Sequence, residues 1–222
     1  MHSKLGFITV GQAPRVDVVP EMAAIIGDKV EIIEAGALDG LTKAQIGEFA
    51  PEEGDIVLAS RMADGTGVVF AEKYIFERLQ SCIDRLQDAG VSCIVFICTG
   101  DFDYDFNHNV PLILPGDILK AVVPIFLSTK KFAVLSPDEK QIPHSYEKWG
   151  FAGDVQVIAA NPYLGFENVV ESVSSLKGLE LDCVVMDCIG YTNEMQAAIK
   201  DILGVPVFMA RSTLARILAE IL

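Results

Sequence analysis

Short apolar runs rich in β-branched residues alternate along the chain with segments of helical periodicity. Apolar runs of this kind, bounded by turn residues, are typical of buried strands. They predict strands at residues 5–10, 30–34, 55–60, 92–98, 112–114, 131–136, 155–159, 183–187 and 205–209, with a returning hairpin strand at 68–70. Strands that alternate with helices indicate an α/β fold with mostly parallel sheets.

Helices are predicted between these strands, most clearly over residues 72–89, where Ile75, Leu79 and Ile83 recur at helical spacing. Thr42 has the character of an N-cap for a short helix that ends near residue 50. Further helices are expected at 15–26, 115–123, 166–176, 192–203 and 212–222, together with one that ends at 149.

Two segments of the chain begin with the same order of predicted elements: a strand, a turn that contains proline, and a helix. The first strand leads into residues 11–15, and the strand at 131–136 leads into residues 137–141. We therefore expect two similar α/β lobes flanked by helices, with a cleft between them. The predicted lobes are residues 1–114 and 115–209, followed by a helix at 210–222 that packs on the first lobe or on a dimer partner.

One stretch occurs twice, at residues 92–101 and 182–191. Each copy has a cysteine, an apolar run, a second cysteine and then a glycine, and each cysteine of the second copy comes 90 residues after its counterpart. Cys98 and Cys188 come where the strands would end, and in open α/β sheets ligands bind beyond that end. We predict that these two cysteines face each other across the cleft.

A purely structural interpretation stays open beside the functional one, because cysteine often acts as a small buried hydrophobe. It is favoured for Cys93 and Cys183, which lie inside the apolar runs, and remains an alternative for Cys98 and Cys188. Two opposed thiols suit a reaction that removes a proton from one face of a carbon acid and returns it to the other. We expect helix N-termini just after Cys98 and Cys188 to favour the anions involved.

Charge and cysteine usage narrow the classes of function. The 222 residues carry a formal net charge of −14, which argues against a nucleic-acid partner or an anionic membrane surface. Residues 1–10 lack the pattern of a signal peptide, and no apolar stretch is long enough to span a bilayer. Five cysteines, an odd number, then predict free thiols in a reducing cytoplasm. No Cys or His spacing indicates a metal site.

Several polar residues follow predicted strands and are candidates for binding a substrate carboxylate. Gln12 and Arg15 come after the first strand, although Arg15 could instead be a solvated residue of a first helical turn. Ser60 and Arg61 come after the third strand, with Asp64 in a segment that reads equally well as an exposed turn.

The second cysteine has its own polar neighbours. Tyr191 and Thr192 could supply hydroxyl groups, whereas Asp187 would raise the pKa of an adjacent thiol if it were ionised. After the first cysteine, acidic residues alternate at 101, 103 and 105, but the pattern lacks the glycine and glutamate of a calcium loop, so a solvated loop is favoured. Trp149 is expected in core packing and His144 at the surface.

The whole chain resembles the AroM family. The resemblance rests on five segments in the right order: Ile8-Thr9-Val10-Gly11-Gln12-Ala13-Pro14-Arg15, Ala63-Asp64-Gly65-Thr66, Cys98-Thr99-Gly100-Asp101-Phe102, residues 141–149, and Met186-Asp187-Cys188-Ile189-Gly190-Tyr191. This resemblance implies no established reaction.

More distantly, the chain is similar to the aspartate/glutamate/hydantoin racemase superfamily. That likeness implies two lobes, a two-cysteine site between them, no cofactor and a homodimer. It makes Cys98 and Cys188 the acid/base pair, with backbone N–H groups of Thr99, Gly100, Ile189 and Gly190 offered to a carboxylate, and with Gly11, Gln12 and Asp101 beside them. The chain departs from the superfamily after both cysteines, where Asn-Thr and Thr-His are replaced by Thr99-Gly100 and Ile189-Gly190.

Two functions are consistent with these observations. The first is a cofactor-independent racemase, isomerase or decarboxylase that acts on a small carboxylate through Cys98 and Cys188. The second is a non-catalytic small-carboxylate binding or regulatory protein that retains the fold, an alternative raised by the altered neighbours of the two cysteines.

Overall fold

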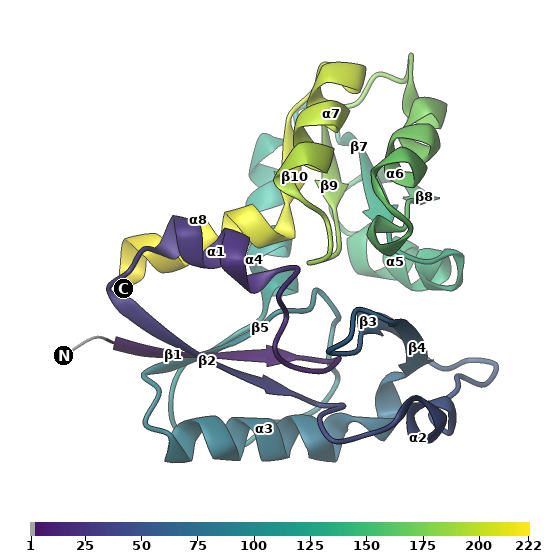
Figure 1. The fold of residues 1–222 in the computed structure, drawn as a ribbon. Helices are drawn as coiled ribbons and strands as arrows, with labels where there is room; N and C mark the ends of the chain where they lie inside the picture. The colour runs from purple at the N-terminus through teal and green to yellow at the C-terminus, as the bar shows by residue number, and fades with distance from the viewer. Residues whose placement is uncertain (1–2) are drawn as a thin grey trace. The chain divides into compact units, whose positions relative to one another are not determined.

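The computed structural model of the protein describes residues 3–222, so that Met1 and His2, the start of the segment examined for a signal peptide, lie outside it. The chain forms two compact units (Figure 1). The first unit contains Met1–Pro115 and Ala215–Leu222, and the second contains Gly116–Leu214. Within residues 3–222, no helix is both long and apolar enough to cross a membrane.

A parallel four-stranded sheet forms the centre of the first unit, in the order β2-β1-β5-β6. Its strands are β1 (Ser3–Thr9), β2 (Val30–Gly36), β5 (Cys93–Phe96) and β6 (Leu112–Ile113). The register pairs Ile8 with Phe96, so the segments that follow β1 and β5 leave the sheet side by side. This register brings the segment after the first strand next to the first cysteine loop.

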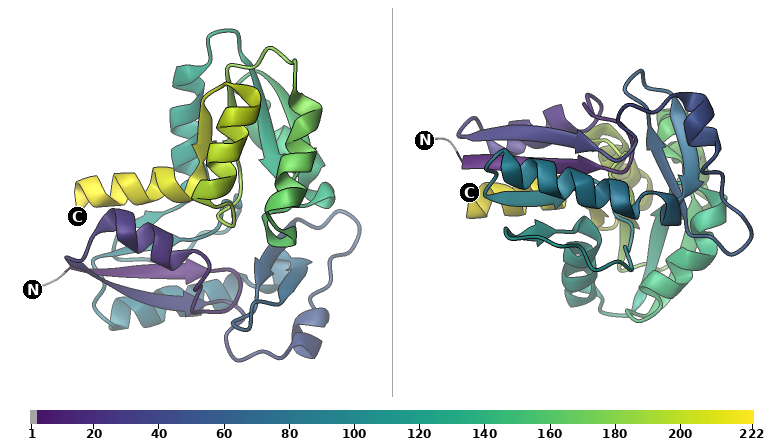
Figure 2. Two further views of the ribbon diagram at one scale, coloured as in Figure 1. Left: turned by 45° about the horizontal axis from the view of Figure 1, so that its top comes forward. Right: turned by 90° about the horizontal axis from the view of Figure 1, so that it is seen from below.

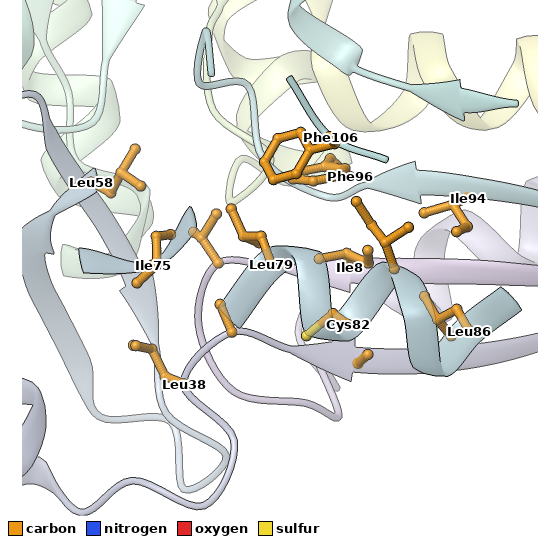
Figure 3. Close-up of a cluster of buried hydrophobic side chains, with 14 of the residues drawn as sticks. Ile8, Leu38, Leu58, Ile75, Leu79, Cys82, Leu86, Ile94, Phe96 and Phe106 are labelled. Atoms are coloured by element: carbon orange, nitrogen blue, oxygen red, sulfur yellow. The ribbon is translucent and has the colours of Figure 1, made fainter. Parts of the chain in front are cut away.

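Helix α3 (Phe76–Asp88), preceded by the 3-10 turn η1 (Glu72–Tyr74), covers one face of this sheet, and α1 (Val19–Ile26) lies on the other face (Figures 1 and 2). The apolar stripe of α3 packs Leu79, Cys82 and Leu86 against the sheet residues Ile8 and Ile94 (Figure 3). The helical spacing read from the sequence thus builds the core of this unit.

An antiparallel hairpin of β3 (Val57–Arg61) and β4 (Gly67–Ala71) stands beside the main sheet. It follows the short helix α2 (Lys43–Gly47), for which Thr42 and Gln45 form a capping box. At the end of β1, a Cβ on Gly11 would overlap the Arg61 carbonyl oxygen and the Ser60 hydroxyl, so only glycine lets the hairpin approach the main sheet this closely.

The second unit repeats the architecture with the parallel order β8-β7-β9-β10. Its strands are β7 (Lys131–Ser136), β8 (Asp154–Ala159), β9 (Cys183–Met186) and β10 (Val207–Met209). The helices that follow β6 are α4 (Pro115–Val122), α5 (Ile142–Trp149), α6 (Phe166–Val173), α7 (Asn193–Leu203) and α8 (Ala210–Ile221), and from Ala215 onward α8 belongs to the first unit. The 3-10 turns between these elements are η2 (Val123–Phe126), η3 (Glu139–Gln141), η4 (Pro162–Leu164) and η5 (Ser174–Leu176). Residues of α6 and α7 fill one core together, and α5 packs on β7 and β8.

The two sheets correspond strand by strand, with β1 matching β7 and β5 matching β9. The amide of Ile97 donates to the Ile8 carbonyl at 2.8 Å, and the amide of Asp187 donates to the Leu135 carbonyl at 3.1 Å. The predicted α/β fold, with two lobes built on parallel sheets, is therefore confirmed. The repeat of the cysteine stretch in the sequence corresponds to a repeat in the backbone.

Two predicted helix starts are wrong. Helix α1 begins at Val19 instead of residue 15, because the amides of Val18 and Val19 both turn back to the Arg15 carbonyl. No helix follows Cys98: residues 97–111 contain neither helix nor strand. Aromatic and acidic residues alternate in this segment, so that Phe102 and Phe106 pack against the core and the acidic side chains face outward. This period of two residues does not match the 3.6-residue period of a helix.

Candidate functional site

In the first unit, the segment after β1 meets the end of the β3–β4 hairpin. The Gln12 amide donates to the Arg61 carbonyl at 3.0 Å, and the Gly11 amide donates to the Thr9 hydroxyl at 3.1 Å. Ser60, only 1% exposed, lies against the same turn. The structure therefore brings together the predicted residues Gly11, Gln12, Ser60 and Arg61, which stand up to 50 positions apart in the sequence.

Arg15 is 2% exposed and lies within this group of residues instead of in a solvated turn. Its Nε and Nη2 atoms hold both carboxylate oxygens of Asp17, at 2.8 and 2.9 Å, and its Nη1 donates to the hydroxyls of Thr9 and Ser60. Burial opposes ionisation of Asp17, but the Arg15 ion pair outweighs it and lowers the pKa of that carboxyl. Arg15 thus positions the two hydroxyl groups.

The side chain of Gln12 also has partners in the protein. Its Nε2 donates to the carbonyls of Leu38 and Leu41, at 3.0 and 2.8 Å, while its Oε1 accepts from the Ala63 amide at 3.0 Å. Gln12 therefore ties the loop after β2 to the hairpin turn. In that turn Asp64 is exposed and accepts from the Thr66 amide, as expected for a turn residue.

Cys98 begins the loop after β5 and is partly exposed. The amide of Gly100 donates to its Sγ at 3.5 Å, and Thr99 between them is 7% exposed. An N–H group directed at sulfur stabilises negative charge on it. The first cysteine therefore has a backbone donor of the kind that supports a thiolate.

Glu72, which the sequence analysis did not select, is a buried acid facing the same loop. It is 3% exposed, and its Oε1 has no hydrogen-bond partner among the described residues. Burial, together with the charges of Asp101 and Asp103, raises its pKa to about 7. The first cysteine loop therefore includes two acids close to a buried carboxyl that titrates near neutral pH.

In the second unit, Cys188 follows β9 and is 6% exposed. The Gly190 amide donates to its Sγ at 3.4 Å, which repeats the contact made by Gly100. The hydroxyl of Tyr163, from η4, lies 3.8 Å from the same sulfur. Tyr163 was missed in the sequence because it follows a different strand, β8, and only the sheet brings it to the cysteine.

Asp187, next to Cys188, is held by two cationic or polar donors. Lys148 Nζ lies 3.0 and 2.9 Å from its two oxygens, and Trp149 Nε1 donates to it at 2.7 Å. Lys148 and Asp187 side chains are 4% and 5% exposed, and Trp149 is fully buried as expected. The carboxylate beside Cys188 is thus compensated, so the expected penalty on a neighbouring thiolate is offset.

The other predicted residues of the second loop take part in its support. Tyr191 is fully buried and donates to the Ala160 carbonyl at 2.5 Å, and burial, followed by the neighbouring Cys188 and Asp187, raises its pKa well above the usual value. Thr192 caps α7 by accepting from the Met195 amide. Arg211, 1% exposed, donates from Nε to the Ile189 carbonyl at 3.0 Å.

All five cysteines are free thiols. Cys93 and Cys183 lie inside β5 and β9, where burial raises the pKa of Cys93 and raises that of Cys183 to about 12. Burial likewise raises the pKa of Cys82, which lies in α3. These three thiols are suited to packing, and only Cys98 and Cys188 are on loops at strand ends.

Among residues 3–222, no group of three or more His, Cys, Asp or Glu side chains could hold a metal ion. The acidic alternation after Cys98 has another explanation in the fold. Phe102, Tyr104 and Phe106 contact one another and the core, which leaves Asp103 and Asp105 exposed.

Comparisons with known proteins agree with this architecture. A family model described as AroM protein matches residues 5–222. No curated protein matches the sequence. Among solved structures, a glutamate racemase from Aquifex pyrophilus is 18% identical, with a TM-score of 0.60 over 99% of this chain and 84% of that one.

Two further similar structures are enzymes of other reaction types. A Nocardia farcinica maleate cis-trans isomerase is 12% identical, with a TM-score of 0.62 over 96% of this chain and 89% of that one. An arylmalonate decarboxylase is 14% identical, with a TM-score of 0.59 over 97% of this chain and 92% of that one. At these identities the likeness shows the fold, which is the two-lobed racemase fold.

Proposed function

We propose that this chain, which belongs to the AroM family, is a cofactor-independent enzyme that uses Cys98 and Cys188 as acid and base. Its substrate is a small carboxylate held in a cleft between the two lobes, and its reaction is a racemisation, isomerisation or decarboxylation.

The matched environment of the two sulfurs carries this proposal. Cys98 and Cys188 follow equivalent strands, and each sulfur accepts from the amide two residues later, at 3.5 and 3.4 Å. A sulfur with a donor of this kind can stay anionic at moderate pH, which a thiol base requires. The three similar enzymes are named for glutamate, maleate and arylmalonate, all carboxylic acids, which supports the substrate class.

The chemistry balances with two thiols alone. In a racemisation, the thiolate of one cysteine takes the proton from the carbon beside the substrate carboxylate, and the electron pair remains as an enolate. The thiol of the other cysteine gives its proton to the opposite face, so the two sulfurs exchange protonation states. In a decarboxylation, CO2 leaves instead of the proton, the enolate takes the thiol proton, and water restores it.

Carboxylate binding is assigned to groups at the ends of β3, β5 and β9. We propose that Ser60, Thr99 and Ile189 present a hydroxyl and backbone N–H groups to the substrate, with Arg61, Asp101 and Thr192 at the edge of the site. Gly11, Gln12, Arg15 and Tyr191 shape the site through the internal contacts described above. The proposal includes no cofactor, a cytoplasmic location and a homodimer.

Iodoacetamide alkylation of the native protein from pH 5 to 9, with each cysteine peptide resolved by mass spectrometry, tests the two thiols. We expect Cys98 or Cys188 to react faster at pH 7 than a free thiol, and Cys93 and Cys183 to stay unmodified because burial raises the pKa of both. If neither loop cysteine exceeds a free thiol, the acid/base proposal is wrong.

Solvent exchange then tests the reaction. Incubation in D2O with a panel of dicarboxylic, amino and aryl-substituted acids should place deuterium beside a carboxylate in at least one of them. Cys98→Ser and Cys188→Ser should each abolish this exchange, whereas Cys82→Ser, in the core of the first unit, should retain it in folded protein. A reactive thiol with no exchange in any acid would favour the binding-protein alternative.

A further inference from the structure

Tyr163 approaches Cys188 from a separate element of the second unit. It lies on η4 (Pro162–Leu164), which follows β8, and its hydroxyl is 3.8 Å from Cys188 Sγ. Either atom of this contact can be the donor. A phenol can accept from a thiol and donate to a thiolate, so the contact is satisfied in both protonation states of the cysteine.

The surrounding residues hold Tyr163 in this position. Its amide donates to Asn161 Oδ1 at 2.8 Å, and the Asn161 amide donates to Asn168 Oδ1 at 3.1 Å. A Cβ on Gly190 would lie 2.8 Å from two ring carbons of Tyr163 and 2.9 Å from its hydroxyl oxygen. The absence of a side chain at Gly190 therefore serves two purposes, since it admits the ring and leaves the amide directed at the sulfur.

The other tyrosine near the sulfur is unsuited to this role. Tyr191 is fully buried, its hydroxyl donates to the Ala160 carbonyl, and burial raises its pKa well above the usual value. Tyr163 is partly exposed and directs its hydroxyl at the sulfur. Asp187 is compensated by Lys148 and Trp149, and both the Tyr163 phenol and the Gly190 amide contact Cys188 Sγ directly.

We propose that Tyr163 is the positioning residue of Cys188, whose hydroxyl orients the sulfur and sets the pH at which it loses its proton. This inference rests on the proposed function in that it assigns a role within the same site. It also adds a phenol contact at Cys188 to the amide contact that the two thiols share.

The test compares Tyr163→Phe with the wild-type protein by alkylation of Cys188 from pH 5 to 9. Loss of a donor to the thiolate should raise the midpoint of Cys188 alkylation by about one pH unit, the shift expected for one hydrogen bond to a charged group. The Cys98 midpoint should stay unchanged. Tyr146→Phe is the matched control, since the Tyr146 hydroxyl contacts the Val157 amide instead of a cysteine.

Gly190→Ala is the second variant, because its Cβ would push the Tyr163 ring away while leaving the hydroxyl in the protein. It should raise the midpoint in the same direction as Tyr163→Phe. An unchanged Cys188 midpoint in a folded Tyr163→Phe protein overturns the assignment.

The outcomes for the site and for the reaction are separable. A shifted midpoint with no deuterium exchange in any acid retains the role of Tyr163 and removes the proposed function. Deuterium exchange in the wild-type protein together with an unshifted Cys188 midpoint in Tyr163→Phe retains the proposed function and removes the role of Tyr163. A merely structural role of Tyr163 would lower the melting temperature without moving the midpoint of Cys188.

Discussion

The two cysteine loops make the same backbone contacts at their starts but differ in the environment of a nearby buried acid. In the second unit, Asp187 lies beside Cys188 with both oxygens held by Lys148 and Trp149. In the first unit, Ile97 has the equivalent place beside Cys98, and the buried acid is Glu72, which faces Asp101 and Asp103 and whose pKa is raised to about 7. One loop thus contains a carboxylate held by a cation and an indole N–H, and the other faces a buried carboxyl with a pKa raised to about 7.

This difference shows how a repeated frame can support unequal roles. The sheet places both sulfurs and directs an amide at each, since those contacts depend on backbone alone. The charge around each sulfur depends on side chains from other strands and helices, and these side chains differ between the two units. We therefore expect the two thiols to respond differently when their acidic neighbours are changed.

Lys148→Met should have the largest effect on this contrast. It leaves the Asp187 carboxylate buried without its cation, which costs about 3 kcal/mol of unfolding free energy. The uncompensated charge should also slow alkylation of Cys188 and leave Cys98 unaffected. Denaturant unfolding and peptide-resolved alkylation measure the two effects.

The control for that variant is Lys140→Met, which removes an exposed lysine from the turn before α5. The double variant Lys148→Met/Asp187→Asn should recover more than half of the lost stability, because the buried charge is gone. If the double variant is as unstable as the single one, Lys148 contributes to the free energy of unfolding through packing of its side chain and not by compensating the charge of Asp187.

Glu72→Gln should have the next largest effect, and its sign depends on pH. The folded protein holds the Glu72 proton up to about pH 7, whereas the unfolded chain loses it near the ordinary value of 4.5. The wild-type protein therefore loses stability from this group as pH rises between those values. The glutamine variant should be more stable than wild type by about 2 kcal/mol at pH 8 and by much less at pH 4.5.

Thermal or denaturant unfolding at the two pH values checks this prediction. The control is Glu53→Gln, which removes a carboxyl group from an exposed position of the same unit. An equal gain at both pH values for Glu72→Gln would contradict the assignment of a raised pKa to Glu72.

Thr192→Ala should have the smallest effect on the free energy of unfolding. It tests whether the Thr192 hydroxyl only caps α7 or also binds substrate. Only the second cysteine loop leads into a helix, α7, which Thr192 caps. Loss of the cap should cost about 1 kcal/mol, as should Thr42→Ala at the capping box of α2. A fall in deuterium exchange for Thr192→Ala but not for Thr42→Ala would show that the Thr192 hydroxyl also contacts substrate.

Much of the fold was accessible from local patterns. The strand at 131–136 was predicted with its observed bounds, and the stripe of Ile75, Leu79 and Ile83 gave α3 to within a few residues of its start. The two errors at helix starts came where backbone turns or aromatic packing determine the local conformation instead of helical spacing. Arg15 folds the chain back at its own carbonyl, and Phe102 and Phe106 hold the Cys98 loop extended against the core.

The candidate site was accessible only in part, because its predicted members were chosen as residues that follow strands. That rule found Ser60 and the cysteines but gave no reason to select Tyr163 or Lys148. Tyr163 reaches Cys188 from the turn after β8, and Lys148 reaches Asp187 from α5. No spacing along the sequence indicates either contact.

Local patterns along the chain establish the alternation of strands and helices and the doubled stretch that contains Cys98 and Cys188. Those features depend on periodicity and on residues that are neighbours in the chain. Three features depend on the folded arrangement: Lys148 compensates Asp187, Glu72 is a buried acid that faces the first cysteine loop, and Tyr163 contacts Cys188. Such contacts arise when parallel strands bring distant loops to one edge of a sheet, where burial and charge act on side chains that the sequence separates.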